Sequence, residues 1–134
     1  MKYLLDTNIC VFLFRRKSSV ALQRLVQTQT GDVGISTVTL AELRFGADKS
    51  GDPPRNHAVI DAFLTNVTIV EFDEEAATFY GSVRSDLESR GIPIGALDTL
   101  IAAHGLSLGV ALVTNNVREF SRIKGLVVED WTQL

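Results

Sequence analysis

A chain of 134 residues is long enough for one domain with a sizeable core and too short for two ordinary domains, so we expect a single domain over residues 1–134. A formal net charge of −3 argues against a protein that binds nucleic acid through bulk positive charge. No apolar run approaches the roughly 20 residues that span a bilayer, and Asp6 interrupts the first apolar stretch too early for a signal peptide. Because the only cysteine, Cys10, permits no internal disulfide, we expect a cytoplasmic protein with no membrane partner.

The predicted elements alternate between strands and helices along the whole chain. Short apolar or β-branched runs bounded by turn formers predict strands, and apolar residues at helical spacing predict amphipathic helices. In the first half of the chain we expect a strand within 3–8, helices at 9–16 and from 18 or 19 onwards, a strand at 33–36 and helices at 37–46 and 55–66. In the second half we expect a strand at 67–72, a helix from the Asp73 N-cap to Arg90, a loop at 91–95 and a helix at 99–108. The chain should end with a strand at 110–114, a short helix around 119–120 and an edge strand at 126–129. This alternation predicts an α/β fold with a central, mostly parallel sheet and helices on both faces.

Acidic and amide side chains fall where the predicted strands end or the following helices begin. They are Asp6, Glu42, Asp98, Asn115 and Asn116. Right-handed crossovers place the carboxyl ends of parallel strands on one edge of a sheet, so we expect these side chains to converge there. Some also have a purely structural explanation, because Glu42 stands at capping-box spacing from Thr39 and Asp98 is a good N-cap. A cluster of three carboxylates suits Mg²⁺ or Mn²⁺, which prefer oxygen ligands and can activate water against a phosphate ester.

Four segments together resemble the PIN-domain ribonucleases and, among them, most closely the VapC toxins of bacterial type II toxin–antitoxin modules. They are L-L-D-T-N at 4–8, T-L-A-E-L at 39–43, G-x-x-D-x-x-I-A-A-H at 95–104 and V-T-N-N-x-x-E-F at 113–120. The resemblance covers essentially the whole chain, including E-D-W at 129–131. It implies a PIN-domain fold and a Mg²⁺- or Mn²⁺-dependent endoribonuclease that cuts exposed loops of tRNA or ribosomal RNA and so stops translation.

The resemblance also implies roles for individual residues. The catalytic and metal-binding set would be Asp6, Asp98 and Glu42, with Glu42 binding the metal directly or through water. Thr7 and Thr114 would support these ligands by hydrogen bonds. Many PIN domains carry a fourth acidic residue where this chain has Asn116, so the number of metal ions, one or two, stays open. Glu119, one helical turn further on, is the candidate substitute.

We also expect some basic residues to contact RNA, and the chain to bind protein partners. The candidate RNA contacts are Arg15, Arg16, Lys17, Arg44, Lys49 and Arg118. Arg15, Arg16 and Lys17 also suit the end of a helix, where basic residues complement the dipole, so their role stays open. The resemblance implies a homodimer and a cognate VapB antitoxin that threads a segment through the groove and places a basic residue near the carboxylates. It also implies a larger assembly of both proteins with DNA.

Two other functions are compatible with the same residues. A phosphatase could use Asp6 as a phosphate acceptor, although haloacid-dehalogenase-type enzymes need a second Asp where this chain has Asn8. A PIN domain that binds RNA without cutting it is the other alternative, which the amide at Asn116 keeps open. Phosphate trapped on Asp6 would support the first, and RNA binding indifferent to metal and to Asp98 would support the second.

Overall fold

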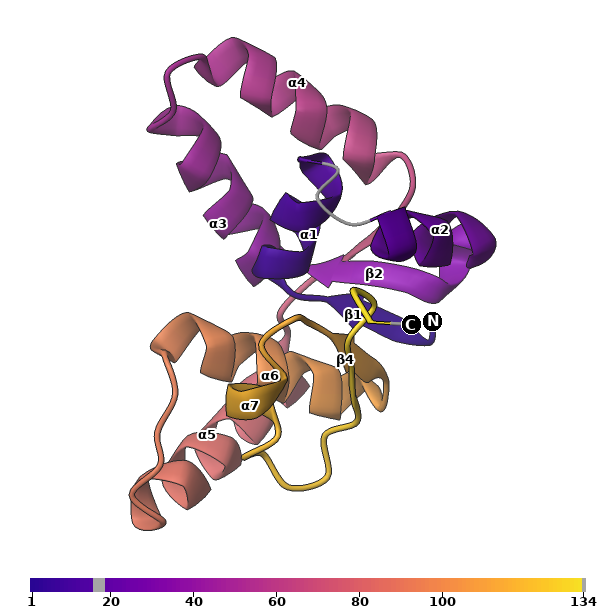
Figure 1. Ribbon diagram of the computed structural model, residues 1–134. Coiled ribbons are helices and arrows are strands. Elements are labelled where there is room, and N and C mark those ends of the chain that lie inside the picture. Colours follow the sequence, from indigo (N-terminus) through magenta and orange to yellow (C-terminus); the bar gives the residue numbers. More distant parts are fainter. Residues whose placement is uncertain (16–18, 134) are drawn as a thin grey trace.

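The computed structural model describes residues 1–15 and 19–133 and is built around one sheet (Figure 1). The strand order is β3-β2-β1-β4-β5, and each neighbouring pair is parallel. The strands are β1 (Tyr3–Leu5), β2 (Val33–Ser36), β3 (Thr68–Val70), β4 (Ala111–Val113) and β5 (Val128–Glu129). The predicted α/β architecture is therefore confirmed, with a sheet that is parallel at every pairing.

Helices cover both faces of this sheet, as predicted. They are α1 (Thr7–Phe14), α2 (Ser19–Gln27), α3 (Thr37–Asp48), α4 (Pro53–Leu64), α5 (Glu74–Ser89), α6 (Ala96–Leu108) and α7 (Val117–Phe120), and a 3₁₀ turn, η1 (Thr30–Asp32), precedes β2. Figure 1 shows α1 to α4 on one side of the sheet and α5 to α7 on the other. Within the described residues, no helix has the length and apolar character needed to cross a membrane.

The core has two halves, one on each face of the sheet. Successive residues of β1 point to opposite faces, so Leu5 packs with Ile9 and Ile35, whereas Leu4 packs with Ile101. Both leucines are completely buried, as expected for a strand in the middle of a parallel sheet. Full burial of such a side chain stabilises the fold by about 1.5–3 kcal/mol. The first strand is therefore held from both sides, and it ends at Asp6.

Two helix starts differ from the sequence prediction in ways that bear on the site. Ser36 caps α3, because its Oγ accepts a hydrogen bond from the Val38 amide at 3.0 Å. The predicted capping box of Thr39 and Glu42 is therefore wrong, and Thr39 lies inside the helix. The predicted N-cap at Asp98 is also wrong, since α6 begins at Ala96. Neither Glu42 nor Asp98 therefore caps a helix.

The C-terminal strand is fixed by a small cluster around Trp131, which is fully buried. Its indole Nε1 donates a hydrogen bond to Glu129 Oε1 at 3.2 Å, and its ring packs edge-on against Tyr3. The Arg24 guanidinium lies 5.2 Å from the same ring and donates to Glu129 at 3.1 Å. The Glu129 carbonyl in turn accepts from the Thr114 amide at 2.9 Å, so this cluster supports the end of β4.

Candidate active site

Asp6 lies at the carboxyl end of β1, at the start of α1, and its side chain is only 1% exposed. Its Oδ1 accepts a hydrogen bond from the Ile9 amide at 2.8 Å, because Asp6 is the N-cap of α1. Its Oδ2 accepts from Thr114 Oγ1, just past β4, at 2.5 Å. An amide of α1 and a hydroxyl that follows β4 therefore fix this carboxylate in one orientation.

Glu42 comes from the second turn of α3 and reaches the same edge of the sheet. Thr7, the first residue of α1, donates from Oγ1 to Glu42 Oε1 at 2.6 Å. Figure 1 shows β2 ending beside the starts of α1 and α3, which explains why residues 35 positions apart meet here. Thr7 therefore makes a hydrogen bond to a predicted ligand, and its role in supporting a metal site stays a prediction.

Asp98 and Glu119 enter from the other half of the molecule. Asp98 lies in the first turn of α6, and Glu119 lies on α7. Asn116 donates from Nδ2 to Glu119 Oε2 at 3.0 Å, while its backbone amide donates to Thr114 Oγ1 at 2.9 Å. Asn116 therefore carries no charge itself but orients a carboxylate one helical turn away.

The pKa values of two of these groups show that the carboxylates share one environment. Burial raises the pKa of Asp6 to about 6, although the Thr114 and Ile9 hydrogen bonds oppose that rise and the charges of Asp98 and Glu42 add to it. Burial also raises the pKa of Asp98, with further contributions from the negative charges of Glu42 and Glu119. The negative charge of Asp6 therefore meets those of Asp98 and Glu42, and the charge of Asp98 meets those of Glu42 and Glu119.

No basic side chain offsets this negative charge within residues 1–15 and 19–133, because none of the ion pairs recorded there includes these four carboxylates. The donors are all oxygen atoms, which suits Mg²⁺ or Mn²⁺ better than Zn²⁺. In the same part of the chain, no three His, Cys, Asp or Glu side chains already stand in a metal-binding geometry. Glu42, for example, is held by Thr7. The donor chemistry and the uncompensated charge nevertheless fit a divalent cation.

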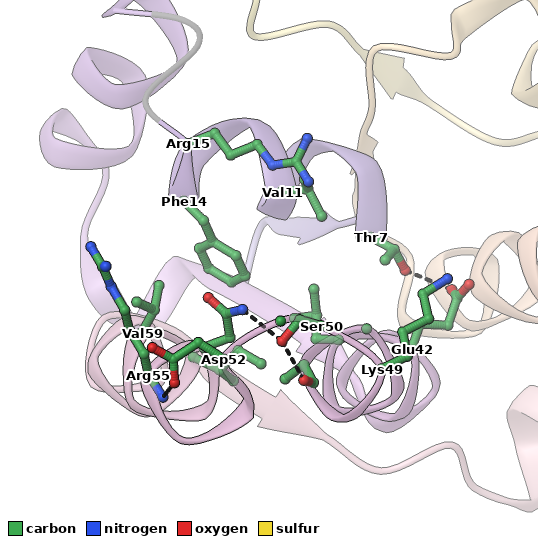
Figure 2. Close-up of a pocket in the computed structure, with 16 residues that line it drawn as sticks. Thr7, Val11, Phe14, Arg15, Glu42, Lys49, Ser50, Asp52, Arg55 and Val59 are labelled. Atoms are coloured by element: carbon green, nitrogen blue, oxygen red, sulfur yellow. Dashed lines mark hydrogen bonds between the residues drawn. The ribbon is translucent and has the colours of Figure 1, made fainter.

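A pocket of about 700 Å³ opens beside Thr7 and Glu42, between α1, α3 and α4 (Figure 2). Figure 2 shows Val11 and Phe14 on the α1 side of this pocket and Val59 on the opposite side. Two of the predicted RNA contacts, Arg15 and Lys49, line it. Sequence reasoning missed a third cation, Arg55. The signal was present in Asp52-Pro53, an N-cap followed by proline, which starts α4 earlier than predicted and places Arg55 in its first turn.

The other predicted RNA contacts have different surroundings. Arg44 joins α3 to α4, since it donates to Asp61 at 2.7 Å and to His57 Nδ1 at 3.1 Å. Its guanidinium is therefore engaged within the protein rather than presented beside the carboxylates. Arg118 is exposed on α7, next to Glu119. Arg16 and Lys17 lie outside the described residues.

Comparison with known proteins gives one consistent result. The PIN-domain family profile matches residues 3–126. A Shigella flexneri protein named tRNA(fMet)-specific endonuclease VapC is 45% identical over 132 residues, which cover 98% of this chain and 99% of that protein. The DNA-bound VapBC structure from Salmonella typhimurium gives a TM-score of 0.94 at 40% identity, covering 98% of both chains. The structure of VapBC2 from Rickettsia felis, bound to a promoter DNA fragment, gives a TM-score of 0.93 at 37% identity. The match covers 98% of this chain and 99% of that chain.

Proposed function

Since this chain belongs to the VapC family of PIN-domain ribonucleases, the toxins of VapBC toxin–antitoxin modules, we propose that its substrate is a tRNA and that it cuts tRNA(fMet). The proposal is supported by the 45% identical relative named for that substrate, which matches this chain over 98% of its length. A tRNA substrate places the action in the cytoplasm. The nuclease names of the relatives also remove the reason to retain a phosphatase as an alternative.

The observation that carries the mechanism is the repulsion between carboxylates at the carboxyl edge of the sheet, which joins Asp98 to Asp6, to Glu42 and to Glu119. We propose that Asp6, Asp98 and Glu42 hold Mg²⁺ or Mn²⁺ and that Glu119 supplies the fourth acidic group in place of Asn116. When bound, such an ion lowers the pKa of a coordinated water and neutralises charge on the phosphate. The donor set and the raised pKa of Asp6 and Asp98 support this assignment.

The protein's own contribution is to position these groups before substrate arrives. Thr114 orients Asp6, Thr7 orients Glu42 and Asn116 orients Glu119, each through one side-chain hydrogen bond. Partners that fix metal-binding carboxylates in this way typically change metal affinity or activity by about 10–100-fold when they are removed. The RNA backbone would be held by cations around the site, which give affinity without reading sequence. They are Arg15, Lys49, Arg55 and Arg118.

Binding partners follow from the relatives in the same way. The Salmonella and Rickettsia structures are VapBC complexes bound to DNA, and the Rickettsia fragment comes from their promoter. We propose that this chain, like those proteins, binds a VapB antitoxin and joins it in a larger assembly on DNA, and that it forms a homodimer. The antitoxin would inhibit by placing a basic side chain among the four carboxylates, which have no basic partner of their own among the described residues.

Cleavage of a total tRNA pool by the purified protein tests the proposal. We expect discrete fragments of tRNA(fMet) in Mg²⁺ or Mn²⁺, none in EDTA, and restored cleavage when metal is added back. An Asp98→Asn variant prepared in parallel should give no fragments, which excludes a contaminating nuclease. Equal cutting in EDTA would contradict the metal assignment. RNA binding by both proteins without cleavage, and indifferent to metal, would instead support the non-catalytic RNA-binding alternative.

A further inference from the structure

We propose that the pocket between α1, α3 and α4 is a subsite for one nucleotide of the RNA, turned out of its strand beside the cleavage site. This inference rests on the proposed ribonuclease function, because it names the feature of the substrate that the enzyme holds. The pocket and the carboxylates share a wall, since Thr7 and Glu42 line the pocket and are hydrogen-bonded to each other at 2.6 Å. A nucleotide in the pocket would therefore be adjacent to the phosphate under attack.

The size and the walls of the pocket suit a nucleobase. Its volume of about 700 Å³ lies within the range of roughly 300–1,000 Å³ that is typical of small-molecule sites. Phe14 points from α1 toward the space between the helices (Figure 2). Its ring packs edge-on against the ring of Phe63, with the two ring centroids 4.9 Å apart. Val59, on the opposite wall, is 39% exposed, so the pocket offers open apolar surface. Single-stranded RNA loops present unstacked bases that bind such aromatic and apolar surfaces.

The charges around the mouth suit the phosphates that flank a nucleotide. Arg15, Lys49 and Arg55 come from the ends of three different helices, and all three are exposed. Among the described residues none of them takes part in an ion pair, so their charges are available to a ligand. Lys49 also lies over the ring of Phe45, which is 64% exposed one turn along α3 from Glu42. The pocket therefore combines apolar walls with three basic residues, which outnumber its two acidic lining residues, Glu42 and Asp52.

The pocket also contains a fixed polar group that could read the edge of a base. Asn56 donates from Nδ2 to Ser50 Oγ at 2.8 Å, and Ser50 donates to the Ala47 carbonyl at 2.6 Å. These two bonds set the orientation of the Asn56 amide inside the pocket. Amide side chains pair with base edges through a carbonyl acceptor and an amino donor. A nucleotide explains the walls, the cations and this amide together, whereas a purely apolar peptide segment would leave the three cations without a role.

Gly46 provides a way to fill the pocket without disturbing the fold. It lies on α3 and lines the pocket, and a Cβ added to it would meet no atom within 4 Å. Gly46→Phe should therefore place a ring in the open space. Gly81→Phe is the matched control, because Gly81 is also a helical glycine with open space around its Cβ and belongs to α5, away from the pocket. Both variants should keep the melting temperature of the parent protein.

The first readout separates RNA recognition from phosphodiester chemistry. We expect Gly46→Phe to lower kcat/KM for the tRNA target by about tenfold to a hundredfold, the effect of losing one stacked base. Hydrolysis of bis(p-nitrophenyl) phosphate, which lacks a nucleobase, should stay at the parent rate in both variants, and so should tRNA cleavage by Gly81→Phe. If the parent protein cuts neither substrate, the proposed ribonuclease function fails rather than the pocket assignment.

A second readout places a particular nucleotide in the pocket. Single abasic substitutions scanned along the cleaved loop should include one position that lowers kcat/KM of the parent enzyme about tenfold or more. The same abasic substitution should have no further effect on Gly46→Phe, because the subsite is already closed. Additive losses would overturn the proposal. Undiminished tRNA cleavage by Gly46→Phe together with weakened antitoxin binding would also overturn it, and would assign the pocket to the antitoxin.

Discussion

Replacing Asp98 by Asn is expected to abolish RNA cleavage while raising the melting temperature of the metal-free protein. The loss of activity should reach about a thousandfold, or about 4 kcal/mol of transition-state stabilisation, because the substitution removes a carboxylate from the proposed metal site. The gain in stability follows from the raised pKa of Asp98, which shows that burial and the charges of Glu42 and Glu119 disfavour its ionised form in the folded protein. Asparagine has the same shape but no charge, so the substitution removes the unfavourable free energy of the buried, repelled carboxylate.

The dependence of this gain on pH gives a stricter test. A carboxyl group whose pKa is raised by folding makes the folded state less stable as pH rises from its ordinary range through the folded pKa. The advantage of Asp98→Asn should therefore be absent near pH 4, about the ordinary carboxyl pKa, and largest at neutral pH. Thermal unfolding in EDTA across this range would measure it.

Asp86 supplies a control with the opposite sign. It pairs with Arg90 and Lys124, and the hydrogen bond from Arg90 lowers its pKa. Its ionised form therefore stabilises the folded protein, and this stability is lost as pH falls through the lowered pKa. Asp86→Asn should lower the melting temperature at neutral pH and leave cleavage unchanged. If the two variants shift the melting temperature in the same direction, the carboxylates at the active site are not mutually repelling.

Replacing Thr114 by Val is expected to weaken metal binding without removing any proposed ligand. The Thr114 hydroxyl donates to Asp6 and accepts from the Asn116 amide, and it is completely buried. Valine has nearly the same shape but leaves both partners without this contact, at a cost of about 1–3 kcal/mol for each unsatisfied group. We expect the Mg²⁺ concentration for half-maximal cleavage to rise about 10–100-fold. A titration of cleavage rate against Mg²⁺ measures this directly.

Thr39→Val is the matched control, since it makes the same chemical change at another completely buried threonine. Among the described residues, the Thr39 Oγ1 atom has no hydrogen-bond partner, so its removal costs no contact. The melting temperature should stay the same or rise slightly, and the Mg²⁺ midpoint should not move. Equal changes in the two variants would mean that Thr114 acts on the fold in general and not on Asp6.

The sequence predicts the site because its chemistry is tied to strand ends. The segment Leu4-Leu5-Asp6 predicts a buried strand with a carboxylate directly after it. Crossovers between parallel strands bring the other acidic residues to the same edge of the sheet. Helix starts are less predictable, because several hydroxyl residues within a few positions can each serve as the N-cap. Ser36 takes the cap of α3 instead of Thr39, which frees Glu42 to bond Thr7.

The pocket depends on packing between elements that sequence spacing does not relate. Its walls come from α1, α3 and α4, and nothing in the local pattern of Arg55 indicates that it faces the same opening as Arg15. The reverse holds for Arg44, which looks like a free cation in the sequence but is engaged by Asp61 and His57 across the α3–α4 hairpin. Which cations serve a ligand and which serve the fold is decided only when distant side chains meet.

Crystals of the protein grown with Mn²⁺, measured at the manganese absorption edge, would test the proposed metal site most directly. We predict an anomalous peak beside the carboxylates of Asp6 and Asp98, and no peak there in crystals of Asp98→Asn. A second peak near Glu119 would show that Asn116 supports a two-metal site. Ordered crystals at saturating Mn²⁺ with no peak beside Asp6, or with manganese bound only elsewhere, would contradict the assignment of these carboxylates as the metal ligands.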